Sequence, residues 1–236
     1  PCTPDYISVI QSAHKSPTPP QLSVTQLIWI KTLVQTSAYL SAGRQHNFLV
    51  WGLGYDSPIW ENANCVSGDK AVDGNGTSGR KEGSTRTVFV ENWRDWIEKV
   101  SGRHPGLEVV QFDKYDTNVK DAEKFMKEPY LLPLPDTINE ECWDVVLVDA
   151  PQGYEPNHPG RHAPTYWSVS MAHSCLKSNP SIHEITIFLH DVNRPLEQQI
   201  IDRILRPNGG VQIGRVEGGA GTLVGFRFTR ESLGVV

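Results

Sequence analysis

The stretch FLVWGLGYDS (residues 48–57) runs from apolar residues directly into Gly52-Leu53-Gly54 and then becomes polar. This pattern predicts a buried strand that ends where another group must approach the backbone, because glycine has no side chain in the way. The flanking sequence indicates what kind of sheet contains this strand and what the approaching group is.

Strand and helix patterns alternate along the chain around this stretch. After a first strand at 47–54, we predict strands at 86–91, 107–113, 143–150 and 184–192, then an antiparallel hairpin formed by VQIGRVEG (211–218) and GTLVGFRF (221–228). Helices are predicted from an N-cap at Ser23 to residue 40 and at 93–102, 118–127, 164–177 and 195–205. The predicted fold class is α/β, with a doubly wound, mostly parallel seven-stranded sheet and a terminal antiparallel hairpin.

The length of 236 residues fits one domain that carries an extension and an inserted loop. Residues 1–22, rich in Pro, Ser and Thr, are predicted to be an N-terminal extension, and residues 23–236 a single domain. The Gly-, Ser- and Asp-rich segment 65–85 lacks apolar periodicity, which predicts a flexible, solvated inserted loop.

Composition excludes some functions and leaves the compartment open. The net charge of −5 argues against a nucleic-acid partner. No segment reaches the ~20 apolar residues of a membrane span, and the chain begins without Met, so we expect any membrane anchor to lie upstream. The four scattered cysteines form no CxxC pair; a disulfide involving Cys2 or Cys65 and reduced, buried thiols are both compatible with this pattern.

Glycines and an acid at two strand ends predict an adenosine-containing cofactor. Gly52 and Gly54 lie at the carboxyl end of the first strand, and Glu91 ends the second, where a carboxylate binds ribose hydroxyls. S-adenosylmethionine fits better than NAD, because the chain lacks GxGxxG and its sheet ends in a hairpin. The fold is therefore expected to be the Rossmann-like class I S-adenosylmethionine-dependent methyltransferase type. Tyr55 is a candidate to contact this cofactor, as are Trp51 and Trp93, with ordinary packing as the alternative for each.

Polar residues at two further strand ends predict the reacting groups. Asp149 ends the fourth strand, next to the cofactor, and His190 with Asp191 ends the fifth. A sugar hydroxyl is a poor nucleophile until its proton is removed, so methyl transfer needs a base or a metal. All three residues could bind a divalent metal, or Asp149 or His190 could act as the general base without a metal. The alternative is that they only cap turns and helices.

The loop after the fourth strand holds candidate substrate-binding residues. A guanidinium binds a carboxylate through two hydrogen bonds, so Arg161 would select a uronic acid over a neutral sugar. A structural ion pair is the alternative for Arg161. Tyr154 is a candidate to stack on a sugar ring, and His158 is a weaker candidate.

Four segments carry a family resemblance: NFLVWGLGYDSPIW (47–60), RTVFVENWRDWIE (86–98), WDVVLVDAPQGYEPNHPGR (143–161) and FLHDVNR (188–194). They resemble the plant polysaccharide-biosynthesis family of glucuronoxylan 4-O-methyltransferases and its irregular-xylem relatives. The resemblance implies an enzyme that methylates O4 of glucuronic acid on an acidic polysaccharide, using S-adenosylmethionine and a divalent metal. It also implies a type II membrane protein of the Golgi lumen, anchored by a segment that this chain lacks.

The resemblance extends to individual positions. It implies cofactor contacts at Gly52 and Gly54, a ribose contact at Glu91, and an acceptor side made of Asp149, Arg161, His190 and Asp191. The chain departs from the family in the insertion at 65–85, in Asn-Trp after Glu91, and in a shorter region at 114–142. The acceptor therefore stays open among glucuronoxylan, arabinogalactan glucuronic acid, another glycan, a small phenol or a protein, and a non-catalytic scaffold is the competing class.

Overall fold

The computed structural model describes residues 6–41, 44–61, 85–130 and 132–234. Most of the predicted loop at 65–85, together with Cys2 and Cys65, lies outside the described residues. None of the helices among these residues has the length and apolarity needed to cross a bilayer.

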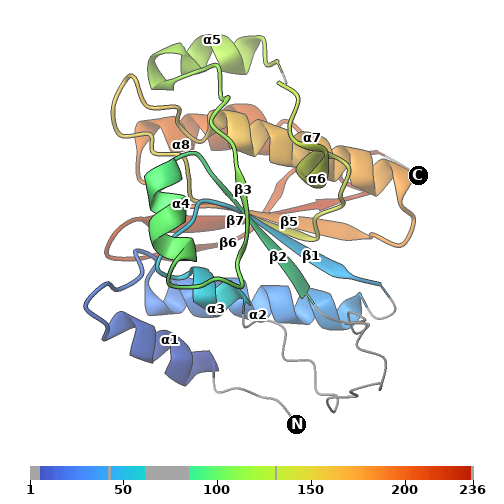
Figure 1. Cartoon of the computed structure of the whole chain (residues 1–236). Helices are drawn as coiled ribbons and strands as arrows, with labels where there is room; N and C mark the ends of the chain where they lie inside the picture. Colours follow the sequence, from blue (N-terminus) through green and yellow to red (C-terminus); the bar gives the residue numbers. More distant parts are fainter. Residues whose placement is uncertain (1–5, 42–43, 62–84, 131, 235–236) are drawn as a thin grey trace.

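Seven strands form one sheet in the order β3-β2-β1-β4-β5-β7-β6 (Figure 1). β1 to β5 run parallel, and β7 pairs antiparallel with both β5 and β6. This order confirms the predicted doubly wound sheet with its antiparallel end. The strands are β1 (His46–Trp51), β2 (Thr85–Glu91), β3 (Glu108–Gln111), β4 (Val145–Val148), β5 (Glu184–Leu189), β6 (Val211–Glu217) and β7 (Thr222–Thr229).

Helices cover both faces of the sheet, with α1 to α3 on one side and α5 to α8 on the other (Figure 1). α4 joins the first group, because its Val100 is buried in the same apolar cluster as α2. The helices are α1 (Tyr6–His14), α2 (Val24–Leu40), α3 (Ser57–Glu61), α4 (Arg94–Ser101), α5 (Ala122–Lys127), α6 (Asp136–Asn139), α7 (His162–Ser178) and α8 (Pro195–Ile200). A 3₁₀ turn, η2 (Val119–Asp121), precedes α5, and a π-helical turn, η3 (Ile201–Leu205), continues α8.

Successive side chains of the central strands point to opposite faces of the sheet, so the core consists of two apolar clusters. Phe48 and Val50 of β1 face the cluster under α2, whereas Leu49 and Trp51 face the cluster under α7. All six residues of β1 are buried, as expected for a parallel strand between two helical layers. Burial on both faces fixes the register of β1, because a shift by one residue would exchange the two sets.

Helix α2 has Ser23 as its N-cap, as predicted, and Ser23 forms a capping box with Gln26. The Gln26 side chain also donates hydrogen bonds to the carbonyls of Gly221 (2.9 Å) and Val216 (3.1 Å). This contact ties the start of α2 to the β6–β7 hairpin, beside the carboxyl end of β5.

Three short helices, α1, α3 and α6, are absent from the sequence-based prediction. α1 lies within the predicted N-terminal extension and packs on α2, with Ile10 buried in the α2 cluster. Its Tyr6 hydroxyl lies 3.3 Å from the Thr32 hydroxyl of α2. α1 and α6 are short segments beside Pro-rich turns, where helical periodicity is hard to detect.

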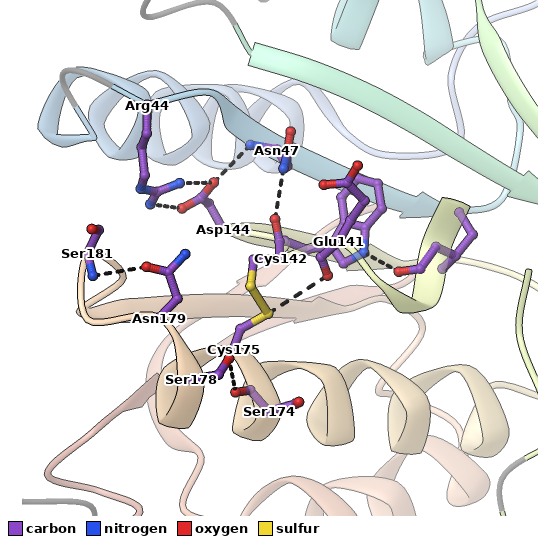
Figure 2. Close-up of a disulfide and its surroundings, with 12 residues drawn as sticks. Arg44, Asn47, Glu141, Cys142, Asp144, Ser174, Cys175, Ser178, Asn179 and Ser181 are labelled. Carbon is purple, nitrogen blue, oxygen red and sulfur yellow. Dashed lines mark hydrogen bonds and ion pairs between the residues drawn. A yellow bond between two sulfur atoms is a disulfide. The ribbon is translucent and has the colours of Figure 1, made fainter. Parts of the chain in front are cut away.

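A disulfide joins Cys142, just before β4, to Cys175 near the end of α7 (Figure 2). The sequence-based reading, which considered Cys2 or Cys65, missed this pair. The two cysteines are 33 residues apart in the chain. Only the packing of α7 against β4 brings their Cα atoms to 5.5 Å, within the range that a disulfide requires.

Candidate functional site

A cavity of about 790 Å³ lies beyond the carboxyl ends of β1, β2, β4 and β5. Ligands bind at this edge in doubly wound sheets, and the volume is in the range of cofactor sites. Glu91 and Asp149 both open onto this one cavity. Of the sequence-predicted residues, those that line it are Gly52, Gly54, Tyr55, Glu91, Trp93, Asp149, Tyr154, Arg161 and Asp191.

The glycines at the end of β1 are fixed by close approaches. Gly52 has a φ of +122°, and a Cβ there would lie 3.0 Å from the Ala150 Cβ after β4. A Cβ on Gly54 would lie 2.4 Å from Oδ1 of Asp56. Gly52 therefore needs glycine, and a side chain at Gly54 would require the Asp56 carboxylate to move; both glycines leave bare backbone at the cavity wall.

Glu91, at the end of β2, is 7% exposed and holds the first loop in place. Its Oε2 accepts a hydrogen bond from the Leu53 N–H (3.1 Å), and its Oε1 accepts from the N–H groups of Asn92 (2.8 Å) and Trp93 (3.0 Å). Each carboxylate oxygen has two lone pairs, so Oε2 retains capacity for a ligand hydroxyl. The proposed ribose role of Glu91 stays a prediction.

Aromatic side chains form the wall on the Glu91 side. Trp93 stacks on Trp96 with ring centroids 6.3 Å apart, and Tyr55 meets Trp96 edge-on at 5.2 Å. Trp93 is 58% exposed, so its face is available to a flat ligand. Trp51 instead lies in the core, where its indole N–H donates to the Ser168 hydroxyl (2.9 Å).

Asp56 is a lining residue that sequence reasoning missed. Its Oδ2 accepts a hydrogen bond from the Trp60 indole N–H (3.0 Å). Burial, with a further contribution from the Asp149 charge, raises the pKa of Asp56 to about 6. The sequence feature that could have identified Asp56 as a cavity residue is its position two residues after Gly54, just before α3.

Asp149 and His190 form a hydrogen-bonded pair between the ends of β4 and β5. The His190 Nδ1 lies 2.7 Å from Oδ1 of Asp149. His190 is 1% exposed, whereas the Asp149 side chain is 20% exposed and lines the cavity. The buried His190 Nε2 has no hydrogen-bond partner among the described residues. Nδ1–H donation to Asp149 is therefore the assignment that satisfies this ring best.

Burial and charge act in opposite directions on this pair. Burial alone would raise the pKa of Asp149, but the attraction of His190 and then Arg161 outweighs it and the pKa is lowered. Burial alone would lower the pKa of His190, but Asp149 outweighs it and the pKa is raised. Both shifts favour the charged forms of the pair.

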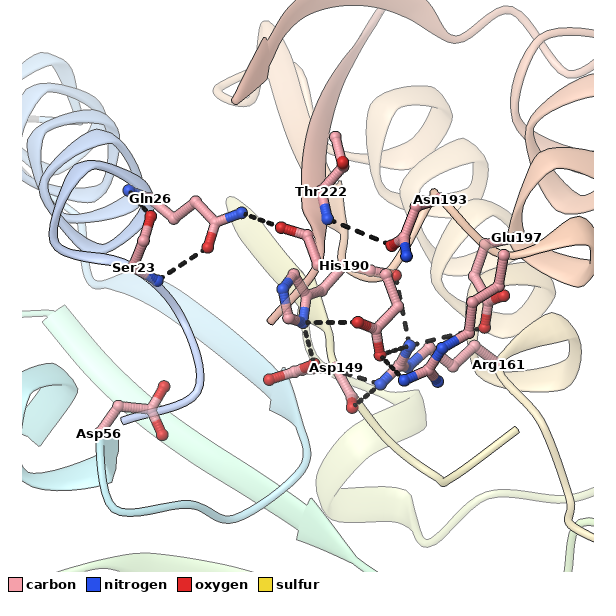
Figure 3. A network of polar contacts seen from close by, with 12 residues as sticks. Ser23, Gln26, Asp56, Asp149, Arg161, His190, Asn193, Glu197 and Thr222 are labelled. Atoms are coloured by element: carbon pink, nitrogen blue, oxygen red, sulfur yellow. Dashed lines mark hydrogen bonds and ion pairs between the residues drawn. The ribbon is translucent and has the colours of Figure 1, made fainter. Parts of the chain in front are cut away.

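Arg161 is buried beside the pair and forms ion pairs with three acids (Figure 3). Its Nη1 lies 2.6 Å from Oδ2 of Asp191 and 3.5 Å from Oε1 of Glu197. Its Nη2 donates to the carbonyl of Asp149 (2.6 Å) and approaches the Asp149 Oδ1 (3.3 Å). The structure therefore places Arg161 in an internal ion-pair network, so its proposed contact with a substrate carboxylate stays a prediction.

Asp191 completes this network from a left-handed backbone conformation, with φ at 62°. Its Oδ2 contacts both Arg161 (2.6 Å) and Arg194 (2.9 Å). Oδ1 faces Gly221, where a Cβ would lie only 2.2 Å away. The absence of a side chain at Gly221 thus makes room for the Asp191 carboxylate.

Asp149, His190 and Asp191 each offer a ligand atom, and these atoms lie within 4.8 Å of one another. Carboxylate oxygens with an imidazole nitrogen are a donor set for several divalent metals, so the set fits a cation in type and spacing. Binding through the His190 Nδ1 would require that atom to lose its proton, and both acids already contact arginines. The metal-ligand role of the three residues stays a prediction.

Of the two remaining residues predicted to bind the acceptor, Tyr154 lines the cavity and His158 does not. Tyr154 is 64% exposed and lines the cavity. His158 is not among the lining residues and packs against Tyr154, with ring centroids 4.4 Å apart. Sequence reasoning missed Arg194 and Glu197; HDVNR contains Arg194, but nothing local distinguishes its role from a helix cap.

Comparison with known proteins gives a consistent set of relatives. The sequence model of the IRX15/IRX15L/GXM family matches residues 130–211. The chain is 33% identical over 171 residues to glucuronoxylan 4-O-methyltransferase 2 of Arabidopsis thaliana, covering 65% of this chain and 51% of that protein. It is 34% identical over 181 residues to arabinogalactan O-methyltransferase 2 of the same plant, covering 67% and 54%.

The chain thus spans about half the length of the relatives it matches. Among solved structures, it is similar to a putative RNA methyltransferase, PH1948, from Pyrococcus horikoshii. That match has 12% identity and a TM-score of 0.47, and it covers 95% of this chain and 96% of the other.

Proposed function

Since the chain belongs to the IRX15/IRX15L/GXM family, we propose that it is an S-adenosylmethionine-dependent O-methyltransferase acting on O4 of glucuronic acid side chains of a glucuronoxylan-type polysaccharide. The observation that carries the proposal is the single cavity that joins Gly52, Gly54 and Glu91 to Asp149. One cavity that holds both sets of residues allows a donor and an acceptor to meet without leaving the protein.

The donor side is the part of the cavity next to β1 and β2. The backbone at Gly52 and Gly54, which bears no side chains, would allow a close approach of the cofactor, and Glu91 would accept hydrogen bonds from its ribose. Trp93 offers an exposed aromatic face for the adenine. When bound, S-adenosylmethionine supplies an activated methyl group.

On the acceptor side, Asp149 is the residue that we assign to the hydroxyl proton. Its side-chain contacts with Arg161 and His190 both use Oδ1, so Oδ2 is the oxygen assigned to the sugar hydroxyl. The Nδ1–H of His190 and the guanidinium of Arg161 hold this carboxylate in place. Asp149 would take the hydroxyl proton while the hydroxyl oxygen bonds to the methyl carbon, whose bond to sulfur would break as S-adenosylhomocysteine leaves.

The same cluster supports a metal-assisted version of this step. A divalent cation held by Asp149, His190 and Asp191 would acidify the acceptor hydroxyl. Chelation tests the choice: lost turnover restored by an added divalent cation assigns the cluster to metal binding, and unchanged turnover assigns Asp149 to general-base catalysis.

Arabinogalactan glucuronic acid is the second candidate acceptor, because the identity to arabinogalactan O-methyltransferase 2 is as high as that to the glucuronoxylan enzyme. We further propose that the protein works in the Golgi lumen as the catalytic part of a type II membrane protein. The Cys142–Cys175 disulfide supports this location, because disulfides persist in oxidising compartments.

Two measurements test the proposed function. Calorimetric titration with S-adenosylhomocysteine should show binding to the cavity, whereas a non-catalytic scaffold should show no heat. Incubation with methyl-labelled cofactor and a panel of glucuronoxylan, arabinogalactan and neutral xylan should label the acidic glycans. Equal labelling of neutral xylan would contradict selection for a uronic acid.

A further inference from the structure

The described lining of the cavity is rich in acids, among them Asp56, Glu91, Asp149 and Asp191. Its cationic side chains among these residues are Arg161 and Arg194. An acceptor that carries a carboxylate would be repelled by this acidic wall unless a cation receives it. Recognition of a uronic acid here rests on the proposed function, which supplies that acceptor.

Arg161 is poorly suited to receive that carboxylate. It is 4% exposed, and its terminal nitrogens contact Asp149, Asp191 and Glu197. Its Nε has no partner among the described residues but is itself buried away from solvent. A substrate carboxylate would have to replace one of these acids, leaving a buried charge without its partner, which is strongly unfavourable.

Arg194 combines a fixed position with access to the cavity. Its backbone N–H donates to the carbonyl of Asp191 (2.9 Å), and it lies directly before Pro195 at the start of α8. Its Nη2 contacts Oδ2 of Asp191 (2.9 Å), which holds one end of the guanidinium. The side chain is 31% exposed, so the planar group has further N–H donors to offer at the cavity wall.

We propose that Arg194 binds the carboxylate of the uronic acid acceptor and thereby selects acidic over neutral sugars. Asp191 contacts both arginines through one oxygen, so it couples the recognition group to the buried network around Asp149. Arg161 then acts as a positioning residue, and Arg194 determines specificity.

The test compares two acceptors that differ only in charge: a glucuronic acid-bearing xylo-oligosaccharide and the same compound with its carboxyl group reduced to the alcohol. For Arg194→Gln, the KM for the acidic acceptor should rise about 10- to 100-fold, the range expected for loss of a charge-assisted hydrogen bond. The preference for the acidic over the reduced acceptor, taken as the ratio of their kcat/KM values, should fall by the same factor, and Arg194→Lys should keep part of the preference, because it keeps the charge without the planar fork.

Controls separate recognition from folding and from the proposed function. Arg203→Gln, at an exposed arginine beside Glu123, serves as the matched variant, and S-adenosylhomocysteine affinity should be unchanged in all variants. An undiminished preference for the acidic acceptor in Arg194→Gln would overturn this inference alone. No transfer by the wild-type protein to either acceptor, despite cofactor binding, would overturn the proposed function and this inference with it.

Discussion

At the scale of single residues, Asp149 has the greatest influence on the proposed reaction. It lines the cavity and also contacts His190 and Arg161 of the buried network. Its neighbours restrict the orientation of its carboxylate before any ligand binds. Preorganisation of this kind lowers the cost of reaching the reactive geometry.

Replacing Asp149 by Asn should remove the proton acceptor while preserving the shape of the side chain. We expect kcat to fall by about 10²- to 10⁴-fold, the usual contribution of a general base. S-adenosylhomocysteine affinity, measured by calorimetry, should change little, because Glu91 and the glycine loop are untouched. Asp202→Asn, at an exposed acid paired with Arg206, is the control. Turnover within tenfold of the wild-type value would contradict the role of Asp149.

Asp56 should reduce the stability of the ligand-free protein at neutral pH. Its pKa is raised from 3.8 to about 6 in the folded state, so the folded state binds the proton more tightly than the unfolded state. Stability should therefore fall as the pH rises from about 4 to 6, by up to about 3 kcal/mol. Asp56→Asn should unfold at a higher temperature than the wild type at pH 7.5, and at a similar temperature at pH 4.

Asp56→Asn should also weaken cofactor binding, because S-adenosylmethionine is cationic and favours an ionised acid in the cavity wall.

Thermal unfolding of Asp56→Asn and the wild type at pH 4 and pH 7.5, with the exposed Asp95→Asn as control, measures the effect of Asp56 on stability. A variant that shows no pH-dependent gain over the wild type would mean that Asp56 titrates normally.

At the scale of elements, the site depends on how the ends of strands meet. β5 leads into Asp191 with its left-handed backbone, and the hairpin before β7 leaves space for that carboxylate at Gly221. The capping residue Gln26 of α2 holds the same hairpin through the Gly221 carbonyl. The acceptor side of the cavity is therefore built from three elements that are distant in sequence.

Gly221→Ala should displace the Asp191 carboxylate, since the added Cβ would lie 2.2 Å from Oδ1. We expect a loss of about 1–3 kcal/mol of stability, as is typical of overpacking, together with a loss of turnover. Gly219→Ala in the same hairpin is the matched control, because a Cβ added there would have no described atom within 4 Å. Denaturant unfolding and turnover of both variants provide the measurement, and equal behaviour of the two would contradict the packing argument.

At the scale of the whole molecule, the sheet separates two apolar clusters and the disulfide ties one helical layer to it. Cys175 lies in the cluster under α7, and Cys142 packs against the same cluster. The bond connects the helix that follows Arg161 to the segment that leads into β4 and Asp149. It therefore joins the two chain segments that meet at the acceptor side.

Removing the disulfide should destabilise the fold without altering the chemistry. For Cys142→Ser/Cys175→Ser we expect a loss of about 2–4 kcal/mol in the free energy of unfolding. Turnover at 25 °C should stay near the wild-type value, because neither cysteine is among the residues that line the cavity. Thermal unfolding with and without reductant checks this, and reduced wild type should match the double variant. An unfolding midpoint insensitive to reductant would contradict the assignment.

Local sequence patterns were enough to predict the order of the strands, the longer helices and the strand ends that carry glycines and acids. These features follow from local periodicity: two-residue alternation, apolar runs, and caps such as Ser23 with Gln26 are set by residues close in the chain. Parallel strands bring their carboxyl ends to one edge. Glu91 and Asp149 could therefore be expected at one cavity from the order of the strands alone.

Which charged groups meet depends on the packing of segments that are distant in the sequence. Arg161 contacts Asp191 and Glu197, and Cys142 meets Cys175, across separations that no local pattern encodes. Asp56 and Arg194 look like ordinary turn residues in the sequence, yet both line the cavity. The physical reason is that ion pairing, burial and disulfide geometry depend on distances of a few ångströms between segments, and those distances are set by the packing of the complete sheet and its helices.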